Sequence, residues 1–389
     1  MDFDFTDEQQ DFRAAVRDFA DEVIRPRAEE MDRLGELPMD IVKQMGEMGL
    51  FGLPFPEEYG GQGADFTTFC VAVEELARVD SSMAITLEAA VGLGANPIFH
   101  FGTEEQKQQW LVPMCRGEIL GAFGLTEPGG GSDAGSTRTS GRLENGEWVI
   151  NGSKAFITNS GTEISKMVTV TAVTGEAEGG RGHKQISAII VPAGTPGFEV
   201  AASYRKVGWH ASDTHELSFI DCRVPEANLL GERGAGYAQF LQTLDDGRIA
   251  VAAMATGLAQ GCLEESLRYA NQRHAFGRPI GGFQALQFKI ADIRVGVDTS
   301  RLATYRAAWL RDQGRPYKAE AAVAKLYASE VAVEAARQAV QIHGAYGFME
   351  EFPVGRHYRD AKALEIGEGT SEIMRWIIAR DLGLPEDPA

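Results

Sequence analysis

The sequence has few basic residues and few cysteines for its length, and these shortages exclude several classes of protein. Its 389 residues carry 37 Lys and Arg against 56 Asp and Glu, so the formal net charge is −19. This acidic balance argues against nucleic acid and anionic membrane surfaces as partners. An anionic ligand therefore needs local Arg, Lys or helix N-termini to hold it.

Cysteine is scarce and widely scattered. Cys70, Cys115, Cys222 and Cys262 form no CxxC pair and no metal-type spacing with the seven histidines. We therefore expect buried free thiols in a reducing compartment and no structural metal site.

The sequence also shows no long apolar run and no recognisable targeting signal. No apolar run approaches the roughly 20 residues that a membrane helix needs. The N-terminal "MDFDFTDEQQ" is acidic and resembles neither a signal peptide nor an Arg-rich import leader. We expect a cytoplasmic protein of bacterial type, or a mitochondrial matrix protein if a leader has been removed.

The hydrophobic pattern changes twice along the chain. Helical spacing dominates the first third, with capping boxes at Thr6–Gln9 and Thr103–Gln106, and the second of these helices is expected to stop at Pro113. From about Gly121, short β-branched runs alternate with Gly, Pro and Asn turns, and "EAEGGRGHK" is predicted as a hairpin tip. After Gly236 three long helical patterns follow with short connections.

These patterns predict a mainly α protein with a central β domain. We expect a helical N-terminal domain over residues 1–120, a small antiparallel β barrel or sandwich over 121–232, and a C-terminal four-helix bundle over 233–389.

Two glycine-rich segments are candidates for chemistry. "FGLTEPGGGSDAGS" offers backbone N–H groups and hydroxyls that can approach a flat ring or a phosphate, although it fits neither dinucleotide-binding nor Walker spacing. "EIGEGTSEIMR" sets Glu368 between two glycines in a gap of a helical region. From these residues alone, a surface turn and a solvated loop carboxylate remain open alternatives.

Taken together, "GLTEPGGGSDAGS", "AFITN", "NQRHAFGRPIGGFQ", "QIHGAYGF" and "YRDAKALEIGEGTSEIMR" resemble the acyl-CoA dehydrogenase family, most closely its short-chain and branched-chain members. The resemblance runs in order over essentially the whole chain. It implies an FAD-dependent enzyme that oxidises the Cα–Cβ bond of an acyl-CoA thioester to the trans-2-enoyl-CoA.

The resemblance implies that Glu368 is the base that takes the α-proton, while FAD takes the β-hydride. Desolvation in a closed site should raise the pKa of Glu368 towards working pH. Its backbone N–H would polarise the thioester carbonyl together with a ribityl hydroxyl of FAD. Isovaleryl-CoA dehydrogenases place their base at the position that Gly247 holds here, so that rival is excluded by the missing side chain.

The remaining site residues are also implied by the resemblance. The substrate set comprises Ser132, Asp245, Arg248 and Gly369, and an ordinary intrahelical ion pair is the alternative for Arg248. In the family, the residue matching Arg273 reaches the FAD of a neighbouring subunit. The cofactor set comprises Phe123, Leu125, Thr126, Gly131, Ser132, Phe156, Thr158, Arg273, Phe276, Gln284, Gln341, Gly344, Thr370 and Glu372.

Three further residues receive non-catalytic or divided interpretations. Glu127 is expected to anchor its loop, and His343 is expected to be a packed core histidine. For Trp209, a packing role and a contact with CoA are equally open alternatives. Many relatives carry Tyr where this chain has Gly367, which predicts tolerance of bulk near the reacting carbons, unless a neighbour such as Trp209 fills the space.

The resemblance further implies a homotetramer and an electron-transferring flavoprotein as electron acceptor. Two alternatives stay open: an acyl-CoA oxidase of the same fold that reduces oxygen, and a non-catalytic acyl-CoA-binding scaffold. Nitroalkane oxidases share the fold but carry Asp where this chain has Glu368. A scaffold would predict a damaged base or flavin set, and both sets are intact.

Overall fold

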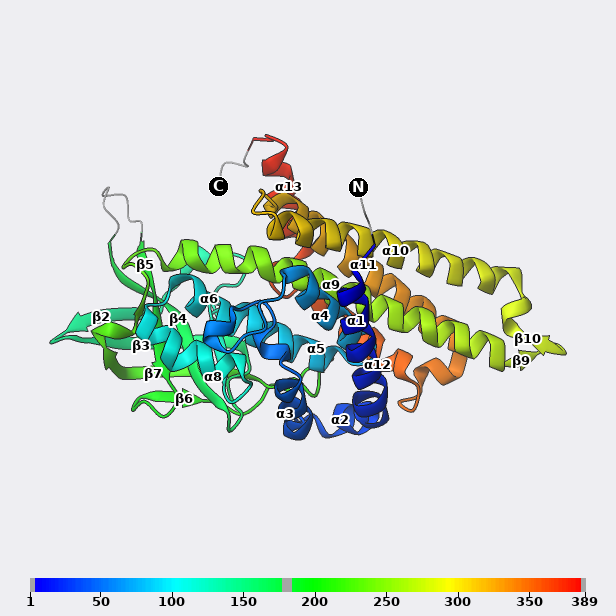
Figure 1. Cartoon of the computed structure of the whole chain (residues 1–389), viewed down its shortest axis with the longest axis horizontal. Coiled ribbons are helices and arrows are strands. Elements are labelled where there is room, and N and C mark those ends of the chain that lie inside the picture. Colours follow the sequence, from blue (N-terminus) through cyan, green and yellow to red (C-terminus); the bar gives the residue numbers. More distant parts are fainter. Residues whose placement is uncertain (1–3, 177–183, 386–389) are drawn as a thin grey trace.

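Helices, then strands, then helices follow one another in the computed structural model, which describes residues 4–176 and 184–385 (Figure 1). The strands of the central β domain gather at one end of the long axis, and the long C-terminal helices extend to the other end, where the short β9–β10 hairpin (residues 274–279) lies. This three-part layout confirms the predicted fold class. The predicted hairpin tip in "EAEGGRGHK" falls largely on residues 177–183, outside the described residues.

The first third is helical, as predicted. Both capping boxes form, at Thr6 and at Thr103, because each Thr side chain accepts from a backbone N–H while a Gln side chain accepts from the Thr backbone. The α-helices are α1 (Asp7–Phe19), α2 (Ala28–Leu34), α3 (Met39–Glu47), α4 (Phe66–Ala77), α5 (Ser81–Glu88), α6 (Asn96–Phe101), α7 (Glu104–Gln106) and α8 (Val112–Cys115). Short 3₁₀ and π turns join them at η1 (Ala20–Ile24), η2 (Arg25–Arg27), η3 (Leu50–Gly52), η4 (Glu57–Tyr59), η5 (Ala89–Ala95) and η6 (Lys107–Leu111).

The expected helix stop at Pro113 is wrong. The chain passes from α7 through the π turn η6 into α8, and Pro113 lies in the first turn of α8. The proline directly follows the π turn, where the regular backbone hydrogen-bond pattern is already interrupted, so the loss of its N–H is tolerated. The helical path therefore continues to Cys115.

One helical run, Ser81–Phe101, reaches the length of a membrane span, which the sequence reading did not identify. Its mean hydropathy is 1.2, and 89% of its most apolar window is buried inside the protein. It consists of α5, η5 and α6, and α5 and η5 pack against the bundle helix α9. The run is therefore core of this fold, and its apolar character comes from burial on all sides.

The β domain is one mixed sheet. Its strand order is β6-β7-β3-β2-β4-β5-β8, and β1 pairs with β4. The pairings β1–β4 and β2–β4 are parallel, so the expected wholly antiparallel sheet is corrected. No pairing closes the path between β6 and β8 among the described residues, so no barrel forms there. The strands are β1 (Leu120–Gly124), β2 (Ser140–Glu144), β3 (Glu147–Thr158), β4 (Ser165–Glu176), β5 (Lys184–Pro192), β6 (Phe198–Val200), β7 (Thr214–Pro225) and β8 (Leu229–Leu230).

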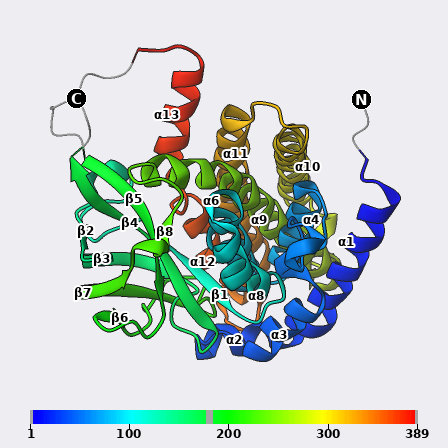
Figure 2. The ribbon, with the colours of Figure 1, turned by 60° about the vertical axis from the view of Figure 1, so that its left-hand side comes forward.

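The C-terminal part is a helical bundle. The long helices α9 (Gly236–Gln272), α10 (Gln284–Asp312) and α11 (Lys318–His343) pack against one another, and α12 (Pro353–Leu364) packs on α9 and α11 (Figure 2). Buried alanines recur along α11, so its backbone approaches its neighbours closely. A short hairpin, β9 (His274–Ala275) and β10 (Arg278–Pro279), joins α9 to α10, and α13 (Ser371–Asp381) ends the described chain.

A buried ion-pair network ties the N-terminal helices to α9. The Arg78 side chain is 1% exposed and donates to Glu75 and to Glu264, at 3.0 and 2.9 Å. Arg17 of α1 joins the same two carboxylates. Several charged partners thereby satisfy each buried group, which is the condition under which a buried ion pair is tolerated. This network fixes α1 and α4 on the helix that carries Gly247 and Arg248.

Candidate functional site

Glu368 lies in the short loop between α12 and α13. Thr370 caps α13, where its side-chain oxygen accepts from Ile373 N at 3.3 Å. Glu368 has φ +54° and Gly369 has φ +108°, both in the left-handed region. That conformation costs a non-glycine residue about 1–2 kcal/mol, so the loop needs support. Lys325 of α11 supplies it by donating to the Gly369 carbonyl at 2.6 Å.

The Glu368 side chain points into the protein, although the residue as a whole is half-buried. Both carboxylate oxygens are shielded from solvent, and neither receives a hydrogen bond from a donor in the described part of the chain. Burial raises the pKa of Glu368, while Arg248 and Lys325 act in the opposite direction. The predicted upward shift for a proton acceptor is therefore present in the structure.

Gly247 of α9 faces this carboxylate directly. A Cβ atom built on Gly247 would overlap Oε2 of Glu368. The position that carries the base in isovaleryl-CoA dehydrogenases is thus adjacent to Glu368 in space, 121 positions earlier in the chain. A side chain at position 247 would therefore take the space that the Glu368 carboxylate occupies here.

Asp245 and Arg248 lie near Glu368 on the helix that carries Gly247. They form an intrahelical ion pair, and Arg248 Nε also donates to the Glu368 carbonyl at 3.4 Å. Burial raises the pKa of Asp245 and lowers that of Arg248. Arg248 thus pairs within its helix and also supports the Glu368 loop, while its role toward the substrate stays a prediction. Gly369, the fourth predicted substrate residue, lies on that loop.

The glycine-rich loop after β1 is anchored by Glu127. Its carboxylate accepts from Arg138 N at 2.8 Å and Thr139 N at 3.0 Å, and it pairs with Lys154 at 2.8 Å. Burial opposes ionisation of Glu127, but Lys154 and the Thr139 contact outweigh it and lower its pKa. Burial lowers the pKa of Lys154 to about 8. Glu127 thus acts as the loop anchor that the sequence indicates.

The predicted flavin residues of the β domain gather around this loop. Phe123 is buried on β1 and Leu125 is buried directly after that strand. The Phe123 ring stacks on Phe240 of α9, with centroids 3.9 Å apart. Thr126 accepts from Ala155 N at 2.9 Å, which places it beside the strand that carries Phe156. The half-buried Thr158 follows on the same strand, and the loop residues Gly131 and Ser132 are exposed.

The exposed ring of Phe156 is the observation that makes these residues suitable for a flavin. Phe156 has φ +61° and a ring that is 66% exposed, although apolar rings normally avoid water. The ring packs on Tyr204 at 5.2 Å and leaves its other side open. An exposed ring beside half-buried hydroxyls and free loop backbone suits a flat, partly polar group such as an isoalloxazine ring.

The other predicted cofactor residues lie at the opposite end of the bundle. Arg273 ends α9, about 37 Å from Arg248 along the helix axis at a rise of about 1.5 Å per residue. Arg273 lies over the Tyr346 ring at 5.8 Å, so the end of α9 meets the 3₁₀ turn η10 (Gly344–Phe348) that follows α11. The exposed members of this group are Arg273, Phe276, Gln284, Gln341 and Gly344. One subunit therefore does not bring its two predicted cofactor sets together.

The residues given other interpretations also have clear positions. His343 is buried, bonds the Ala339 carbonyl at 2.8 Å and stacks on Tyr269, as expected of a core histidine. Trp209 packs against the main core and donates its backbone N–H to Asp360 at 2.6 Å. Glu372 is exposed in the first turn of α13.

Two buried charged residues of the site were missed by sequence reasoning. Glu88 is the last residue of α5 and lies within hydrogen-bonding reach of Glu368. Lys325 supports the loop from α11, and burial lowers its pKa to about 8. Each is a lone charged residue in an apolar stretch, "ITLEAAVGL" and "AAVAKLYAS". That isolation was the available signal.

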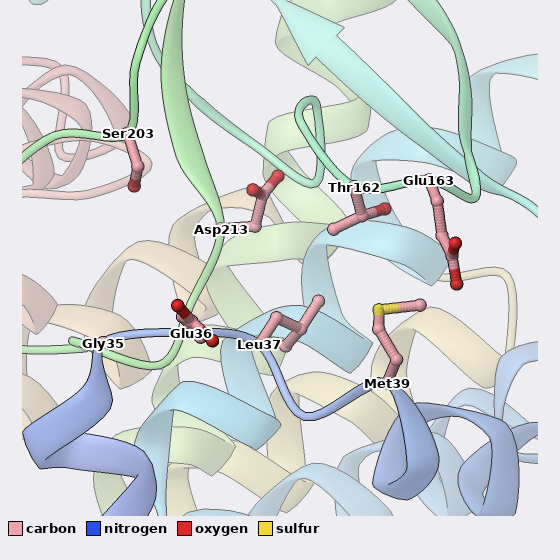
Figure 3. Close-up of a pocket in the computed structure, with 8 residues that line it drawn as sticks. All are labelled: Gly35, Glu36, Leu37, Met39, Thr162, Glu163, Ser203 and Asp213. Carbon is pink, nitrogen blue, oxygen red and sulfur yellow. The ribbon is translucent and has the colours of Figure 1, made fainter.

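A separate surface cavity of about 250 Å³ lies between the α2–α3 connection and the β domain. It is lined by Leu37 and Met39 on one side and by Thr162, Glu163 and Asp213 on the other (Figure 3). None of the predicted catalytic, substrate or cofactor residues lines it, so it is not part of the site described above.

Comparison with known proteins decides the family. Three family models match in order: "Acyl-CoA dehydrogenase, N-terminal domain" over residues 6–118, the middle domain over 122–222 and the C-terminal domain over 234–383. The chain belongs to the acyl-CoA dehydrogenase family. The sequence-based identification is thereby confirmed, and with it the enzyme class, a flavoprotein oxidoreductase.

Individual family members resemble the chain over nearly its full length. It is 52% identical over 382 residues to "Probable acyl-CoA dehydrogenase YngJ" of Bacillus subtilis (strain 168), covering 98% of this chain and 100% of that protein. The structure of butyryl-CoA dehydrogenase from Megasphaera elsdenii matches with a TM-score of 0.94 and 43% identity, covering 98% and 100%. A chain in a structure described as the electron transferring flavoprotein of Acidaminococcus fermentans matches with a TM-score of 0.94 and 45% identity, covering 98% and 99%.

Proposed function

We propose that this acyl-CoA dehydrogenase carries out FAD-dependent α,β-dehydrogenation of a short or branched acyl-CoA, with Glu368 as the base. The observation that carries the proposal is the Glu368 carboxylate itself. It is shielded from solvent, accepts no hydrogen bond from an N–H group of the described residues, and has a raised pKa. A carboxylate in that condition is a better base than one in water. The similarity to a butyryl-CoA dehydrogenase supports the short acyl chain.

The residues around Glu368 have defined tasks in this proposal. Lys325 and Arg248 hold the backbone of the loop, so the side chain is presented from a fixed position. The backbone N–H of Glu368 would donate to the thioester oxygen and make the α-proton more acidic. Glu368 takes that proton, and its oxygens then carry it. Bound FAD supplies the acceptor for the β-hydride, since no side chain can accept one.

Each FAD would be held by two sets of residues, one from its own subunit and one from a neighbouring subunit. Phe123, Leu125, Thr126, Gly131, Ser132, Phe156 and Thr158 would face the ring, and Thr370 and Glu372 would lie on its phosphate side. The set around Arg273 would serve the cofactor of a neighbouring subunit, which its distance from Arg248 supports. We therefore propose a homotetramer, with the domain boundaries at 120/121 and 232/233.

The electron acceptor and the compartment belong to the same proposal. We propose an electron-transferring flavoprotein as acceptor, in line with the similarity to a chain from the Acidaminococcus fermentans structure. A cytoplasmic or matrix location fits the four free, buried cysteines, which suit a reducing compartment.

The test is anaerobic bleaching of bound flavin by butyryl-CoA, compared in the wild type, Glu368→Gln and Glu365→Gln. Glu365 lies on the same loop and pairs with Lys362, so its substitution makes the same change of charge outside the site. Glu368→Gln should keep FAD and bind acyl-CoA but lose reduction by several orders of magnitude. Glu365→Gln should bleach at the wild-type rate. Near-normal bleaching in Glu368→Gln would refute the assignment.

A further inference from the structure

Glu88 places a second carboxyl group next to the proposed base. It ends α5, is 0% exposed, and lies within hydrogen-bonding reach of Glu368. Neither of its oxygens receives a hydrogen bond from a donor in the described residues, and the Glu368 oxygens share that condition. Within residues 4–176 and 184–385, the hydrogen-bonding partner available to each of these carboxyl groups is thus the other carboxyl group.

Two glycines make room for the pair. A Cβ atom built on Gly92 of η5 would lie 2.7 Å from Oε1 of Glu88, and one on Gly247 of α9 would overlap Oε2 of Glu368. A side chain at either position would push its carboxyl group away from the other. The contact between Glu88 and Glu368 therefore depends on backbone approach from both sides.

A buried carboxyl pair without other donors must share a proton, because two adjacent carboxylates cannot both ionise out of water. The surrounding charges decide which member holds it. Arg248 of α9 and Lys325 of α11 favour the charged form of Glu368, whereas Glu368 is the charged group that faces Glu88. Glu74 and Glu75 of the adjacent α4 are paired with Arg301 and Arg78.

Because Arg248 and Lys325 both contact the Glu368 loop, the geometry favours Glu88 as the member that carries the proton. Burial and then the neighbouring Glu368 raise its pKa well above the usual range. A protonated carboxyl group has one O–H to donate, and Glu368 is the acceptor within reach. A hydrogen bond to the charged form of an acid favours that form.

We propose that Glu88 is a positioning residue that holds the shared proton and donates it in a hydrogen bond to Glu368, keeping that base ionised and in place. The inference rests on the proposed role of Glu368. In the reaction the α-proton goes to a Glu368 oxygen, and Glu88 keeps its own proton. No further acid or base is needed.

The test follows the rate of anaerobic flavin bleaching by butyryl-CoA against pH in the wild type, Glu88→Leu and Glu88→Gln. Loss of the donor in Glu88→Leu should make Glu368 harder to ionise and move the acidic limb of the profile up by about one pH unit. Glu88→Gln keeps an N–H donor and should shift the limb less. Thr86→Val, on the same buried helix, should leave the limb in place.

The direction of the shift separates this role from its rivals. A limb that moves to lower pH would mean that Glu88 is ionised and repels Glu368, which overturns the proposal. A uniform loss of rate with an unmoved limb would show a packing role and also overturn it. Glu368→Gln loses bleaching at every pH if the proposed function is right, whatever Glu88 does, so the two claims fail separately.

A second measurement needs no turnover. The infrared difference spectrum between the wild type and Glu88→Gln should show the loss of one carbonyl stretching band of a buried protonated carboxyl group, and that band should be retained in Thr86→Val. Asp360, whose pKa burial also raises, contributes equally to all three spectra. Because Gln preserves the volume of Glu, this variant tests the proposal even if Glu88→Leu does not fold. Retention of the band in Glu88→Gln would place the proton elsewhere and overturn the proposal.

Discussion

Gly247 and Glu368 compete for the same space: a Cβ atom on Gly247 of α9 would overlap Oε2 of Glu368 from the α12–α13 loop. The glycine is therefore a condition for the position of the Glu368 carboxylate, the proposed base. Gly247 lies in the interior of a helix, where glycine costs about 1 kcal/mol of stability relative to alanine. The need for space beside Glu368 therefore outweighs the loss of helix propensity at this position.

Gly247→Ala should displace the Glu368 carboxylate and slow flavin bleaching about 100-fold, the usual scale for a displacement of about 1 Å in a reacting group. The thermal midpoint should not fall, because alanine favours the helix. The double variant Gly247→Glu with Glu368→Gly should recover part of the activity by supplying the carboxylate from α9. Wild-type bleaching in Gly247→Ala would contradict the steric argument.

Arg273→Ala should weaken FAD binding about 10- to 100-fold, as expected for a lost charge-assisted contact to phosphate. Arg278→Ala is the matched control, because Arg278 lies on the same hairpin and packs over the Phe283 ring. The measurement is the dissociation constant of FAD at several protein concentrations. A stable monomer that keeps full FAD would contradict the neighbour-subunit role.

Gly367→Tyr should cut kcat/KM for isobutyryl-CoA about 10-fold or more and spare butyryl-CoA. A Cβ atom at Gly367 would meet the Ala363 carbonyl at 3.5 Å, an ordinary contact, so the backbone accepts a side chain there. The added ring would fill space that a branched acyl group needs. Equal loss for both substrates, or refusal of every branched acyl-CoA by the wild type, would show that Gly367 does not set this preference.

Asp360→Asn should alter the pH dependence of stability. Burial and then Asp80 raise the pKa of Asp360 to about 7. Between about pH 4 and 7 the folded state thus binds more protons at this site than the unfolded state, so this residue lowers stability as the pH rises. The difference in unfolding free energy between variant and wild type should grow by at most about 1.4 kcal/mol per pH unit. Denaturant unfolding at pH 5, 6 and 7 measures it, and a constant difference would contradict the shift.

The sequence by itself determined the order of the fold and the family, and it led to the proposal of Glu368 as the base. Helical spacing, the two capping boxes and the β-branched runs are local signals, because they depend on residues a few positions apart. The resemblance carried by "EIGEGTSEIMR" and its companion motifs identified the family, which the comparisons confirm. Gly247 and Gly367 were also identified from the sequence, as positions where some relatives carry a different residue, before any contact was known.

Only the tertiary structure decided what surrounds the base. Glu88, Gly92, Gly247, Lys325 and Glu368 come from five different elements, and nothing in their local sequence says that they meet. The parallel pairing of β1 with β4 and the continuation of the helix through Pro113 were likewise set by distant contacts and by the π turn before α8. Burial is a property of the packed protein, and burial is what leaves Glu88 and Glu368 with each other as partners.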